Sequence, residues 1–379
     1  MREPAPRINK STERNPSRKA RCFHSLQAAG DWPRVGAAMT NRAIFVFLFV
    51  LLIPLRVSAN PYLPKPGEKP IAIRIATSAV TGGFVQLYTG LDNKIFEKYG
   101  LRCEHVYIRG QSPALAALAN DQVQFNYGAA DGSLPGLAAG VDAKFIASPL
   151  VKLPYVMVAR KEIRRPEDLK GKAIGVTRPG DLSARLSRQV VRKFGLTADD
   201  VTIHPIGGSQ QERYQAMVGN VVQAILVTPP LDVRAKSDGF NVIYRLIDLD
   251  IPFIYSSLIT NYKMLRERPD TVQRMVAALA ESVWFVEKNP EKAKAAIAKA
   301  MRVKDEEALQ SSFNVYAKEI VDRTMMVPGK SISEAVEIAR ETGTIIRKKP
   351  EELYDNSFVI NLEKSGFLKE LWGGENYRR

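Results

Sequence analysis

Cysteine and histidine are scarce in this chain of 379 residues, which holds two cysteines and three histidines. Cys22 lies in an N-terminal region that we expect to be removed, so Cys103 has no partner for an internal disulfide. His105 and His204 are the histidines beyond that region, and neither has a second ligand at a spacing typical of a metal site. The sequence therefore predicts no disulfide, no metal and no cofactor.

Motifs that mark nucleotide binding or nucleophilic catalysis are also missing. The sequence contains no G-x-x-x-x-G-K-[ST] phosphate loop, and no G-x-G-x-x-G follows an expected strand. It contains no G-x-S-x-G nucleophile elbow either. These absences favour a protein that binds a molecule without transforming it.

Basic residues exceed acidic ones by 15, but the excess is not gathered into a patch. Residues 1–59 carry a net charge of +7, and the remaining 320 residues share a net charge of +8. No block of Lys and Arg is interleaved with aromatic residues, as it would be in a nucleic-acid interface. We therefore do not expect nucleic acid as a partner.

The N-terminal region contains the layout of an export signal. From Met39 to Ala59, one arginine precedes an apolar run over residues 43–55, and a small-residue sequence follows. The run is shorter than the roughly 20 residues that a spanning helix needs. We expect a periplasmic protein exported through Met39–Ala59, with an uncleaved membrane anchor as the alternative. Residues 1–38 are rich in Arg and Pro without periodicity, which is typical of a misassigned extension or a disordered tail.

Short apolar runs alternate with helical patterns after an extended linker expected at residues 60–70. The length suggests about two domains, and the alternation is typical of parallel sheets covered on both faces by helices. The sequence therefore predicts an α/β fold. The expected strands are Ile71–Thr77, Leu101–Ile108, Val123–Tyr127, Phe145–Val151, Ala173–Thr177, Val201–Ile206, Ala224–Thr228 and Val242–Leu246, and the expected helices include Phe84–Tyr99, Pro113–Asn120, Leu182–Phe194 and Gln210–Val218.

Two pairs of segments resemble each other within the chain. ALANDQVQF (residues 117–125) and AMVGNVVQA (216–224) each join a helix end, a turn with Asn and the start of a strand. Likewise, IATSAVTGG (75–83) parallels GVTRPGDLS (175–183). Any βαβ unit shares some of these features, but together they favour two similar α/β lobes of about 100 residues each.

Three sequences mark expected helix starts. Ser112-Pro113 combines an N-cap with proline at the first helical position. SQQE (residues 209–212) and SISE (331–334) have the spacing of capping boxes, in which the hydroxyl and the carboxylate satisfy free backbone donors.

Small and hydroxyl-bearing residues follow the expected strands, beginning with the loop after Thr77. In open parallel sheets, ligands bind beyond the carboxyl ends of the strands. Glycine allows close approach of the backbone, and the first turn of the next helix attracts anions. The sequence therefore predicts a binding cleft with one wall formed by Ser78, Thr81, Gly82, Gly83, Gln111, Ser112, Ala130 and Asp131, and the other by Thr177, Arg178, Asp181 and Thr228.

Arg178 is the residue from which we expect an ionic contact. At a strand tip, its guanidinium would pair with a carboxylate, sulfonate or phosphate through two parallel hydrogen bonds. The alternative is a surface arginine beside Asp181. Phe84 and Tyr255 are candidates for aromatic walls of the cleft, with the hydrophobic core as the alternative place for Phe84.

Four stretches of the chain carry a resemblance to a known family. They are NKIFEKYGLRCE (residues 93–104), ALAALANDQVQFNYGAADG (114–132), RRPEDLKGKAIGV (164–176) and NYKMLRERPDTVQRMVAALAESVWFVEKNPEKA (261–293). In this order and spacing the chain, from Ile71 to about Trp372, resembles the solute-binding proteins of ABC importers of the nitrate/sulfonate/taurine type.

The resemblance implies a type II periplasmic-binding fold, with two doubly wound lobes around a central ligand cleft. One lobe would comprise residues 71–152 and 252–379 and the other residues 153–251, joined by crossovers near 152–155 and 248–252. It also implies a monomer that binds a small organic ligand, anionic or heterocyclic, by hinge closure and delivers it to a membrane permease and its ATPase.

Two alternatives use the same scaffold. An enzyme, such as a cofactor-precursor synthase or lyase, would need an acid or base in the cleft, for which Asp131, Asp181 and His204 are candidates. A ligand sensor would signal to a membrane kinase instead of feeding a permease, and the sequence alone does not separate it from a transport receptor.

Overall fold

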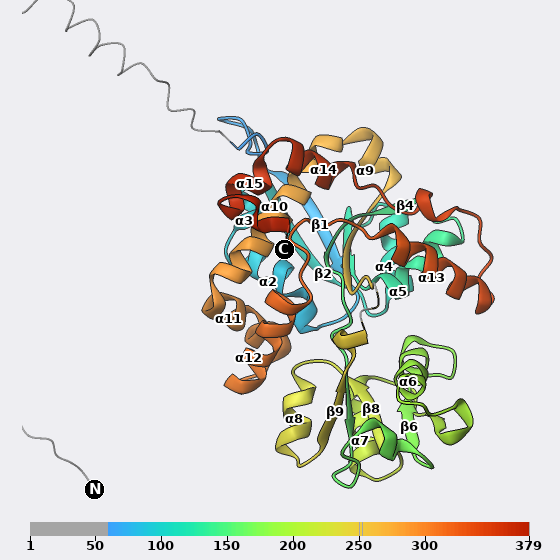
Figure 1. Cartoon of the computed structure of the whole chain (residues 1–379). Coiled ribbons are helices and arrows are strands. Elements are labelled where there is room, and N and C mark those ends of the chain that lie inside the picture. The colour runs from blue at the N-terminus through green and yellow to red at the C-terminus, as the bar shows by residue number, and fades with distance from the viewer. Residues whose placement is uncertain (1–59, 250, 252, 379) are drawn as a thin grey trace, which may run out of the picture. The chain divides into compact units, whose positions relative to one another are not determined.

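The computed structural model describes residues 60–249, 251 and 253–378 of the chain. The predicted N-terminal extension and the predicted signal Met39–Ala59 lie outside these residues, as do Asp250 and Pro252 in the predicted second crossover. The strands of the described part form two five-stranded sheets (Figure 1). Over the same residues, no helix is long and apolar enough to cross a membrane.

The first sheet has the strand order β2-β1-β3-β10-β4. β1 pairs in parallel with β2 and β3, whereas β10 is antiparallel to both of its neighbours. The chain reaches β10 only after it has built the second sheet. The strands are β1 (Ile71–Thr77), β2 (Leu101–Tyr107), β3 (Phe125–Gly128), β4 (Ala143–Leu150) and β10 (Ser256–Asn261).

The second sheet repeats this arrangement with the order β7-β6-β8-β5-β9. β6 pairs in parallel with β7 and β8, and β5 is antiparallel to β8 and β9. Its strands are β5 (Val156–Ala159), β6 (Ala173–Val176), β7 (Thr202–Pro205), β8 (Ala224–Val227) and β9 (Asn241–Arg245). The α/β fold is confirmed, but the prediction of wholly parallel sheets is wrong, because each sheet contains one antiparallel strand.

The two antiparallel strands were absent from the predicted set. β5 and β10 each follow directly from a link between the sheets, without the helix that precedes a strand in a parallel unit. Every residue of both strands is buried, so neither shows the alternation of a half-exposed strand.

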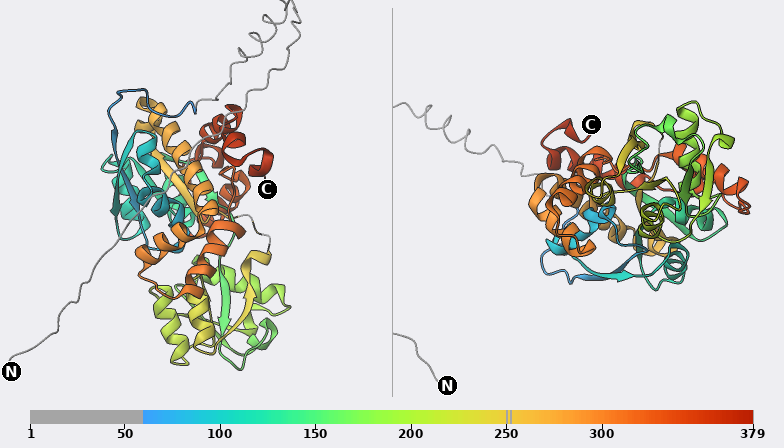
Figure 2. Two further views of the ribbon diagram at one scale, coloured as in Figure 1. Left: turned by 90° about the vertical axis from the view of Figure 1, so that its left-hand side faces the viewer. Right: turned by 90° about the horizontal axis from the view of Figure 1, so that it is seen from below.

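Helices cover both sheets, and we call each sheet with its helices a lobe. Figure 2 shows the green-to-yellow part of the chain around one sheet, and the blue, teal, orange and red parts around the other. Helices of the first lobe are η1 (Gly82–Phe84), α2 (Val85–Asp92), α3 (Ile95–Lys98), α4 (Gln111–Ala119), α5 (Ala130–Ala138), α9 (Tyr262–Glu267), α10 (Pro269–Lys288), α11 (Pro290–Met301), α12 (Glu306–Asn314), the π-helical η5 (Val315–Glu319), α13 (Gly329–Glu341), η6 (Pro350–Glu352), α14 (Ser357–Lys364), α15 (Phe367–Trp372) and η7 (Glu375–Arg378). Those of the second lobe are η2 (Pro166–Leu169), α6 (Leu182–Lys193), η3 (Ala198–Asp200), α7 (Gln210–Val218) and α8 (Leu231–Ser237), and η4 (Leu246–Leu249) begins the return to the first sheet.

Each sheet has a hydrophobic core on both of its faces. In the first lobe, Ile75 packs into the cluster that contains α10, whereas the next residue, Ala76, packs into the cluster that contains Leu115 of α4. In the second lobe, Met157 and Val158 likewise belong to clusters on opposite faces. Burial on both faces explains why an inner strand such as β8 reads as a continuous apolar run.

The repeated segments occupy equivalent places in the two lobes. Asp121 and Asn220 both have a left-handed backbone, with φ of 57° and 61°, in the turn after α4 and after α7. Gln124 then accepts a hydrogen bond from the backbone N–H of Arg74 at 2.9 Å, and Gln223 accepts one from Ala173 at 3.0 Å. Arg74 in the first lobe is therefore equivalent to Ala173 in the second, which makes Ser78 equivalent to Thr177. The predicted alignment of IATSAVTGG with GVTRPGDLS pairs Ser78 with Arg178 and is one residue out of register.

The helix-start predictions have mixed outcomes. Ser209 and Glu212 form the predicted capping box of α7, but Ser331 lies inside α13, so the second predicted box is wrong. α4 begins at Gln111 rather than at Pro113. The predicted helix Phe84–Tyr99 begins at the end of η1 and is divided into α2 and α3, which are separated where Lys94 adopts a left-handed conformation with φ of 57°.

Candidate functional site

A cavity of about 860 Å³ lies between the loops of the two lobes. Loops after β1 and β3 and residues near the start of α12 line it from the first lobe, and the loops after β7 and β8 line it from the second. Of the predicted site residues, those that line the cavity are Ser78, Thr81, Phe84, Asp131, Thr228 and Tyr255. Tyr155 and Gln210 line it as well.

On the first-lobe wall, one side chain ties three loops together. The Ser78 hydroxyl donates to Oε1 of Gln111, and Nε2 of Gln111 donates to the Ser133 hydroxyl. Ser133 in turn donates to the carbonyl of Ala129 at 3.4 Å. Gln111 therefore fixes the positions of the β1 and β3 loops relative to the start of α4, and this wall is assembled before a ligand arrives.

Two predicted glycines allow tyrosine rings to pack against the backbone. A Cβ atom at Gly82 would lie 2.7 Å from the ring of Tyr316, and a Cβ at Gly83 would overlap the ring of Tyr255. The two tyrosine rings are stacked, with centroids 5.8 Å apart. Gly82 and Gly83 are thus buried beneath the tyrosine rings, and the absence of a side chain at these positions leaves room for Tyr316 and Tyr255. Neither glycine lines the cavity, although both were predicted to contact a ligand.

Thr81 and Phe84 position this wall from the same loop. Thr81 caps η1 by accepting from the N–H of Gly83 at 3.3 Å, and its hydroxyl lies 3.4 Å from the Tyr255 hydroxyl. Phe84 is only 2% exposed and packs edge-on against Tyr127. Phe84 thus borders the cavity and belongs to the core at the same time.

In the second lobe, α7 makes the equivalent cross-links. Gln210 accepts from the backbone N–H of Thr228 at 2.8 Å, and its Nε2 donates to the Thr228 hydroxyl at 3.2 Å. The start of α7 and the end of β8 are therefore held together, as Gln111 holds the first-lobe loops.

The structure does not bring the other predicted residues of the second lobe to the cavity. Arg178 is exposed, and its backbone N–H donates to Asp181 at 3.2 Å. Asp181 caps α6 through the N–H of Ala184, and it accepts from the Ser183 hydroxyl at 2.7 Å. Thr177 accepts a hydrogen bond from Arg213 at 2.8 Å. In the first lobe, Ser112 is exposed on α4, and Ala130 is buried beside Asp131.

Arg213 and Asn126 are buried polar residues that the sequence analysis did not select. Arg213 in α7 is 5% exposed, and its Nε has no hydrogen-bond partner in the described part of the chain. Burial lowers the pKa of its guanidinium, and the neighbouring Tyr155, which lines the cavity, acts in the opposite direction. Both amide atoms of Asn126 in β3 also lack partners there. The sequence does hold a signal for Asn126, because it is a polar residue within the otherwise apolar strand FNYG.

Asp131 is the one predicted carboxylate that lines the cavity. Asp131 is exposed to the cleft, and partial desolvation raises the pKa of its carboxyl. Burial likewise raises the pKa of Tyr155 and Tyr255. At neutral pH the cleft thus presents phenol hydroxyls as uncharged hydrogen-bonding groups.

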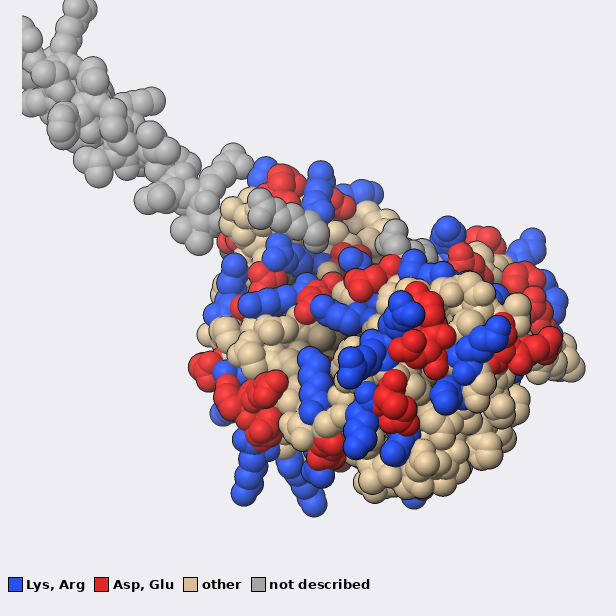
Figure 3. All heavy atoms as spheres, turned by 60° about the horizontal axis from the view of Figure 1, so that its bottom comes forward, with Lys and Arg blue, Asp and Glu red and all other residues tan. Residues whose placement is uncertain are grey.

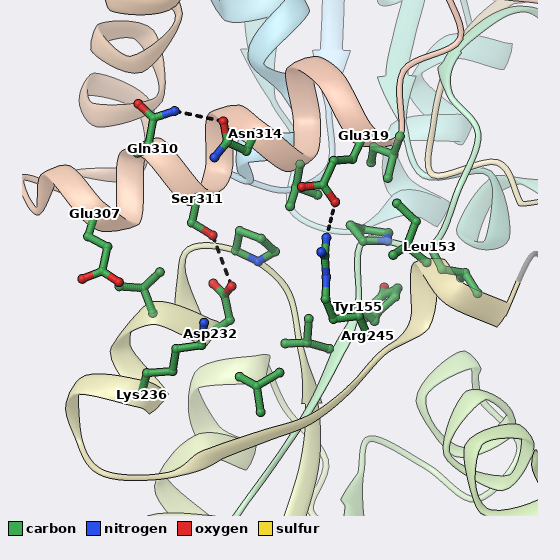
Figure 4. Close-up of a pocket in the computed structure, with 18 of the residues that line it drawn as sticks. Leu153, Tyr155, Asp232, Lys236, Arg245, Glu307, Gln310, Ser311, Asn314 and Glu319 are labelled. Atoms are coloured by element: carbon green, nitrogen blue, oxygen red, sulfur yellow. Dashed lines mark hydrogen bonds and ion pairs between the residues drawn. The ribbon is translucent and has the colours of Figure 1, made fainter. Parts of the chain in front are cut away.

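A second hollow, of about 460 Å³, lies between α8 and β9 of the second lobe and the α12–η5 region of the first (Figure 4). Ser311 in α12 donates to Asp232 in α8 at 3.2 Å, and Arg245 forms an ion pair with Glu319 of η5. Nearby, the Tyr316 hydroxyl donates to the carbonyl of Pro229 at 3.1 Å. These contacts join the lobes on one side of the ligand cavity.

Charges of both signs are interspersed on the face shown in Figure 3, with a broad uncharged area beside them. A nucleic-acid interface requires basic side chains gathered along one face or groove. This face of the molecule has no such arrangement.

Two sheets with one antiparallel strand each, and a cavity lined from both sides, define a two-lobed binding-protein fold. The family model described as "NMT1/THI5 like" matches residues 82–293 of the chain. The chain belongs to this NMT1/THI5-like family.

Named relatives are binding proteins. A protein of Brucella abortus, provisionally named a binding protein, is 27% identical over 223 residues, which cover 55% of this chain and 65% of the relative. A provisionally named periplasmic binding protein of an ABC transporter from Brachyspira hyodysenteriae is 26% identical over 217 residues, covering 53% of this chain and 61% of the relative. The matches thus span just under two thirds of the length of these relatives.

Solved structures show the same fold at low identity. The aliphatic sulphonate binding protein SsuA of Escherichia coli has a TM-score of 0.61 at 17% identity and covers 76% of this chain and 93% of its own. SsuA of Xanthomonas axonopodis pv. citri, bound to MOPS, has a TM-score of 0.55 at 16% identity, covering 78% and 98%. The desulfurization enzyme DszB has a TM-score of 0.58 at 16% identity, covering 77% and 99%. The fold alone therefore accommodates both binding proteins and an enzyme.

Proposed function

We propose that this protein is the periplasmic receptor of an ABC importer, and that it binds a small organic ligand between its two lobes. The observation that carries the proposal is the cavity of about 860 Å³, which is lined by strand-end loops from both sheets. A cavity of this size, with aromatic walls and a few fixed polar groups, suits a small organic molecule. Membership of the NMT1/THI5-like family and the names of the relatives support the same function.

Hinge closure is the mechanism that the chain path supports. β4 ends at Leu150 and β5 begins at Val156, and β9 ends at Arg245 before β10 begins at Ser256. The two lobes are thus joined by two connections, so rotation about them would open and close the cavity. A ligand would first meet the preassembled Gln111 wall, and closure would add Thr228 and Gln210 from the other side. The permease would then recognise the closed form, and residues 39–59 would direct export.

The placement of the candidate acids and bases favours a receptor over an enzyme. Of the three, only Asp131 lines the cavity. The Asp181 carboxylate is occupied by the N-terminus of α6, and His204 lies on β7, which is the edge strand of its sheet. The other two carboxylates that line the cavity are engaged elsewhere, because Asp238 accepts from Tyr214 and Arg234, and Asp305 caps α12. Asp131 therefore has no free carboxylate partner for acid–base chemistry among the cavity residues.

A thermal-shift screen of small organic compounds tests the proposal. A ligand present at about 100 times its dissociation constant should stabilise the protein by about 2.7 kcal/mol. Mass analysis should recover that ligand unchanged after incubation, and small-angle scattering should show a more compact particle in its presence. Conversion of the ligand to a product would contradict the receptor function. A well-folded sample that no compound stabilises would also contradict it.

A further inference from the structure

Arg213 is a buried cation without an acidic partner. It is 5% exposed, and none of the ion pairs among the described residues includes it. Its Nη1 donates to the Thr177 hydroxyl at 2.8 Å and to the carbonyl of Gly208 at 3.2 Å. Both acceptors are neutral, so they orient the guanidinium without neutralising its charge. A buried charge that remains unpaired is costly to the folded state.

The free donors of Arg213 lie on a single edge of the guanidinium. Nη1 makes both hydrogen bonds, whereas Nε is fully buried without a partner in the described part of the chain. Nη2 forms no hydrogen bond there either, and it is absent from the fully buried atoms, so it keeps contact with solvent. The Nε and Nη2 hydrogens of an arginine point in parallel, which is the geometry that matches two oxygens of one acidic group.

The nearby carboxylates are committed elsewhere. Asp181 accepts from the N–H groups of Arg178 and Ala184 and from the Ser183 hydroxyl. Glu212 closes the capping box with Ser209. Neither carboxylate is therefore free to neutralise Arg213 without uncapping its own helix.

The first lobe shows that the fold does not need an arginine here. α4 and α7 are equivalent helices of nine residues each, and their first residues are Gln111 and Gln210. At the fourth position, where α7 has Arg213, α4 has Ala114, which is completely buried. Arg213 does not itself line the cavity, but it lies one turn after Ser209 and Gln210, and its guanidinium is near Tyr155, and all three of these residues line it.

We propose that Arg213 is the anchor for an acidic group of the ligand, a carboxylate, sulfonate or phosphate, which the Nε–Nη2 edge binds with two hydrogen bonds. This inference rests on the proposed receptor function and names the class of its ligand. Thr177 acts as a positioning residue, because its hydroxyl accepts a hydrogen bond from Nη1 and so fixes one end of the guanidinium. The anion acts as the acidic partner that Arg213 lacks within the described part of the chain. Binding therefore neutralises the charge of a guanidinium that is already buried in the folded protein.

The first experiment uses inorganic anions as probes and requires no knowledge of the ligand. Melting temperatures are compared in sodium sulfate, sodium acetate and sodium chloride at equal ionic strength, for wild type, Arg213→Met and Arg178→Gln. We expect sulfate or acetate to stabilise the wild type more than chloride does, Arg213→Met to lose this difference, and Arg178→Gln to keep it. An equal gain in wild type and Arg213→Met overturns the inference, as does no gain over chloride in the wild type.

A second experiment screens organic acids together with their uncharged amides. We expect acids to bind and Arg213→Met to weaken them about tenfold or more, as for the loss of charge-assisted hydrogen bonds. Arg213→Lys, which keeps the charge but not the planar fork, serves if Arg213→Met does not fold, and it should also weaken binding. Binding of amides but of no acid overturns this inference and leaves the receptor function standing. Binding of neither class overturns both.

Discussion

Helices α4 and α7 occupy equivalent places in the two lobes, yet they bring different chemistry to the cavity. Gln111 at the start of α4 bonds to Ser78 and Ser133, and these three side chains form a neutral hydrogen-bonded network on the first-lobe wall. Gln210 at the start of α7 bonds to Thr228 in the same manner, but Arg213 one turn later leaves an edge unpaired. The side-chain amide at the start of each helix is thus paired, whereas the charged group of Arg213 keeps an unpaired edge.

The difference teaches that a repeated scaffold can divide the task of binding. A preassembled wall limits the ordering that a ligand must impose, whereas an unpaired cation supplies attraction that is realised only on binding. The two lobes also differ in packing. The first lobe contains the long helix α10 and the stacked rings of Tyr255 and Tyr316, which have no equivalent in the described part of the second lobe. The following experiments test how far the lobes differ.

The largest expected effect concerns the reactivity of Cys103 in β2 of the first lobe. Burial raises the pKa of this thiol to about 12. At pH 8, its thiolate fraction and its rate of alkylation by iodoacetamide should be lower than those of a free cysteine by about a thousandfold. Peptide mapping after alkylation in buffer and in urea measures this rate and separates Cys103 from Cys22. Fast labelling of Cys103 in buffer would show that the first lobe opens readily.

The next effect compares glycines in equivalent loops. Gly83→Ala would force the Tyr255 ring out of its place, and overpacking of this kind costs about 1–3 kcal/mol in unfolding free energy. Gly180→Ala in the second lobe is the matched control, because its Cβ would meet no atom within 4 Å, and we expect a change within about 0.5 kcal/mol. Urea denaturation measures both. Equal effects would mean that the loops are packed alike.

A smaller effect is expected where the lobes touch. Tyr316→Phe removes the hydrogen bond from the first lobe to the carbonyl of Pro229, at a cost of about 0.5–1.5 kcal/mol. Tyr107→Phe is the control, since Tyr107 is 54% exposed and its hydroxyl has no hydrogen bond among the described residues. Thermal denaturation distinguishes the two variants. An identical response of both would indicate that the contact does not hold the lobes together.

The smallest effect is a dependence on pH at Asp232, which Ser311 contacts across the lobes. Burial raises the pKa of this carboxyl above that of the unfolded chain. The folded state therefore binds the proton more tightly, so stability is gained as the pH falls through the folded pKa and levels off below the unfolded pKa of about 4. Asp232→Asn keeps an acceptor for Ser311 and should raise the melting temperature slightly at pH 7. The gain should vanish near pH 4, and a constant gain at both values would contradict this explanation.

The sequence predicted the α/β alternation well because inner strands such as Ala224–Val227 are buried on both faces and read as unbroken apolar runs. It did not predict β5 and β10, since their pairing is decided by chain segments far away in sequence. For the candidate site, loop position identified Ser78, Asp131 and Thr228. It selected Arg178 over Arg213, because a strand-tip location is visible in the sequence, whereas burial in α7 depends on the packing of neighbouring loops.

The late position of β10 in the chain also fixes the order in which the lobes become complete during synthesis. All five strands of the second sheet lie within residues 156–245, whereas the first sheet lacks its antiparallel strand, between β3 and β4, until Ser256–Asn261 has been made. Until then, β3 and β4 face each other across a gap with unpaired edges. A nascent chain that stalls before residue 256 thus presents one finished lobe and one open sheet, and the open sheet is the place where premature pairing with another chain would begin.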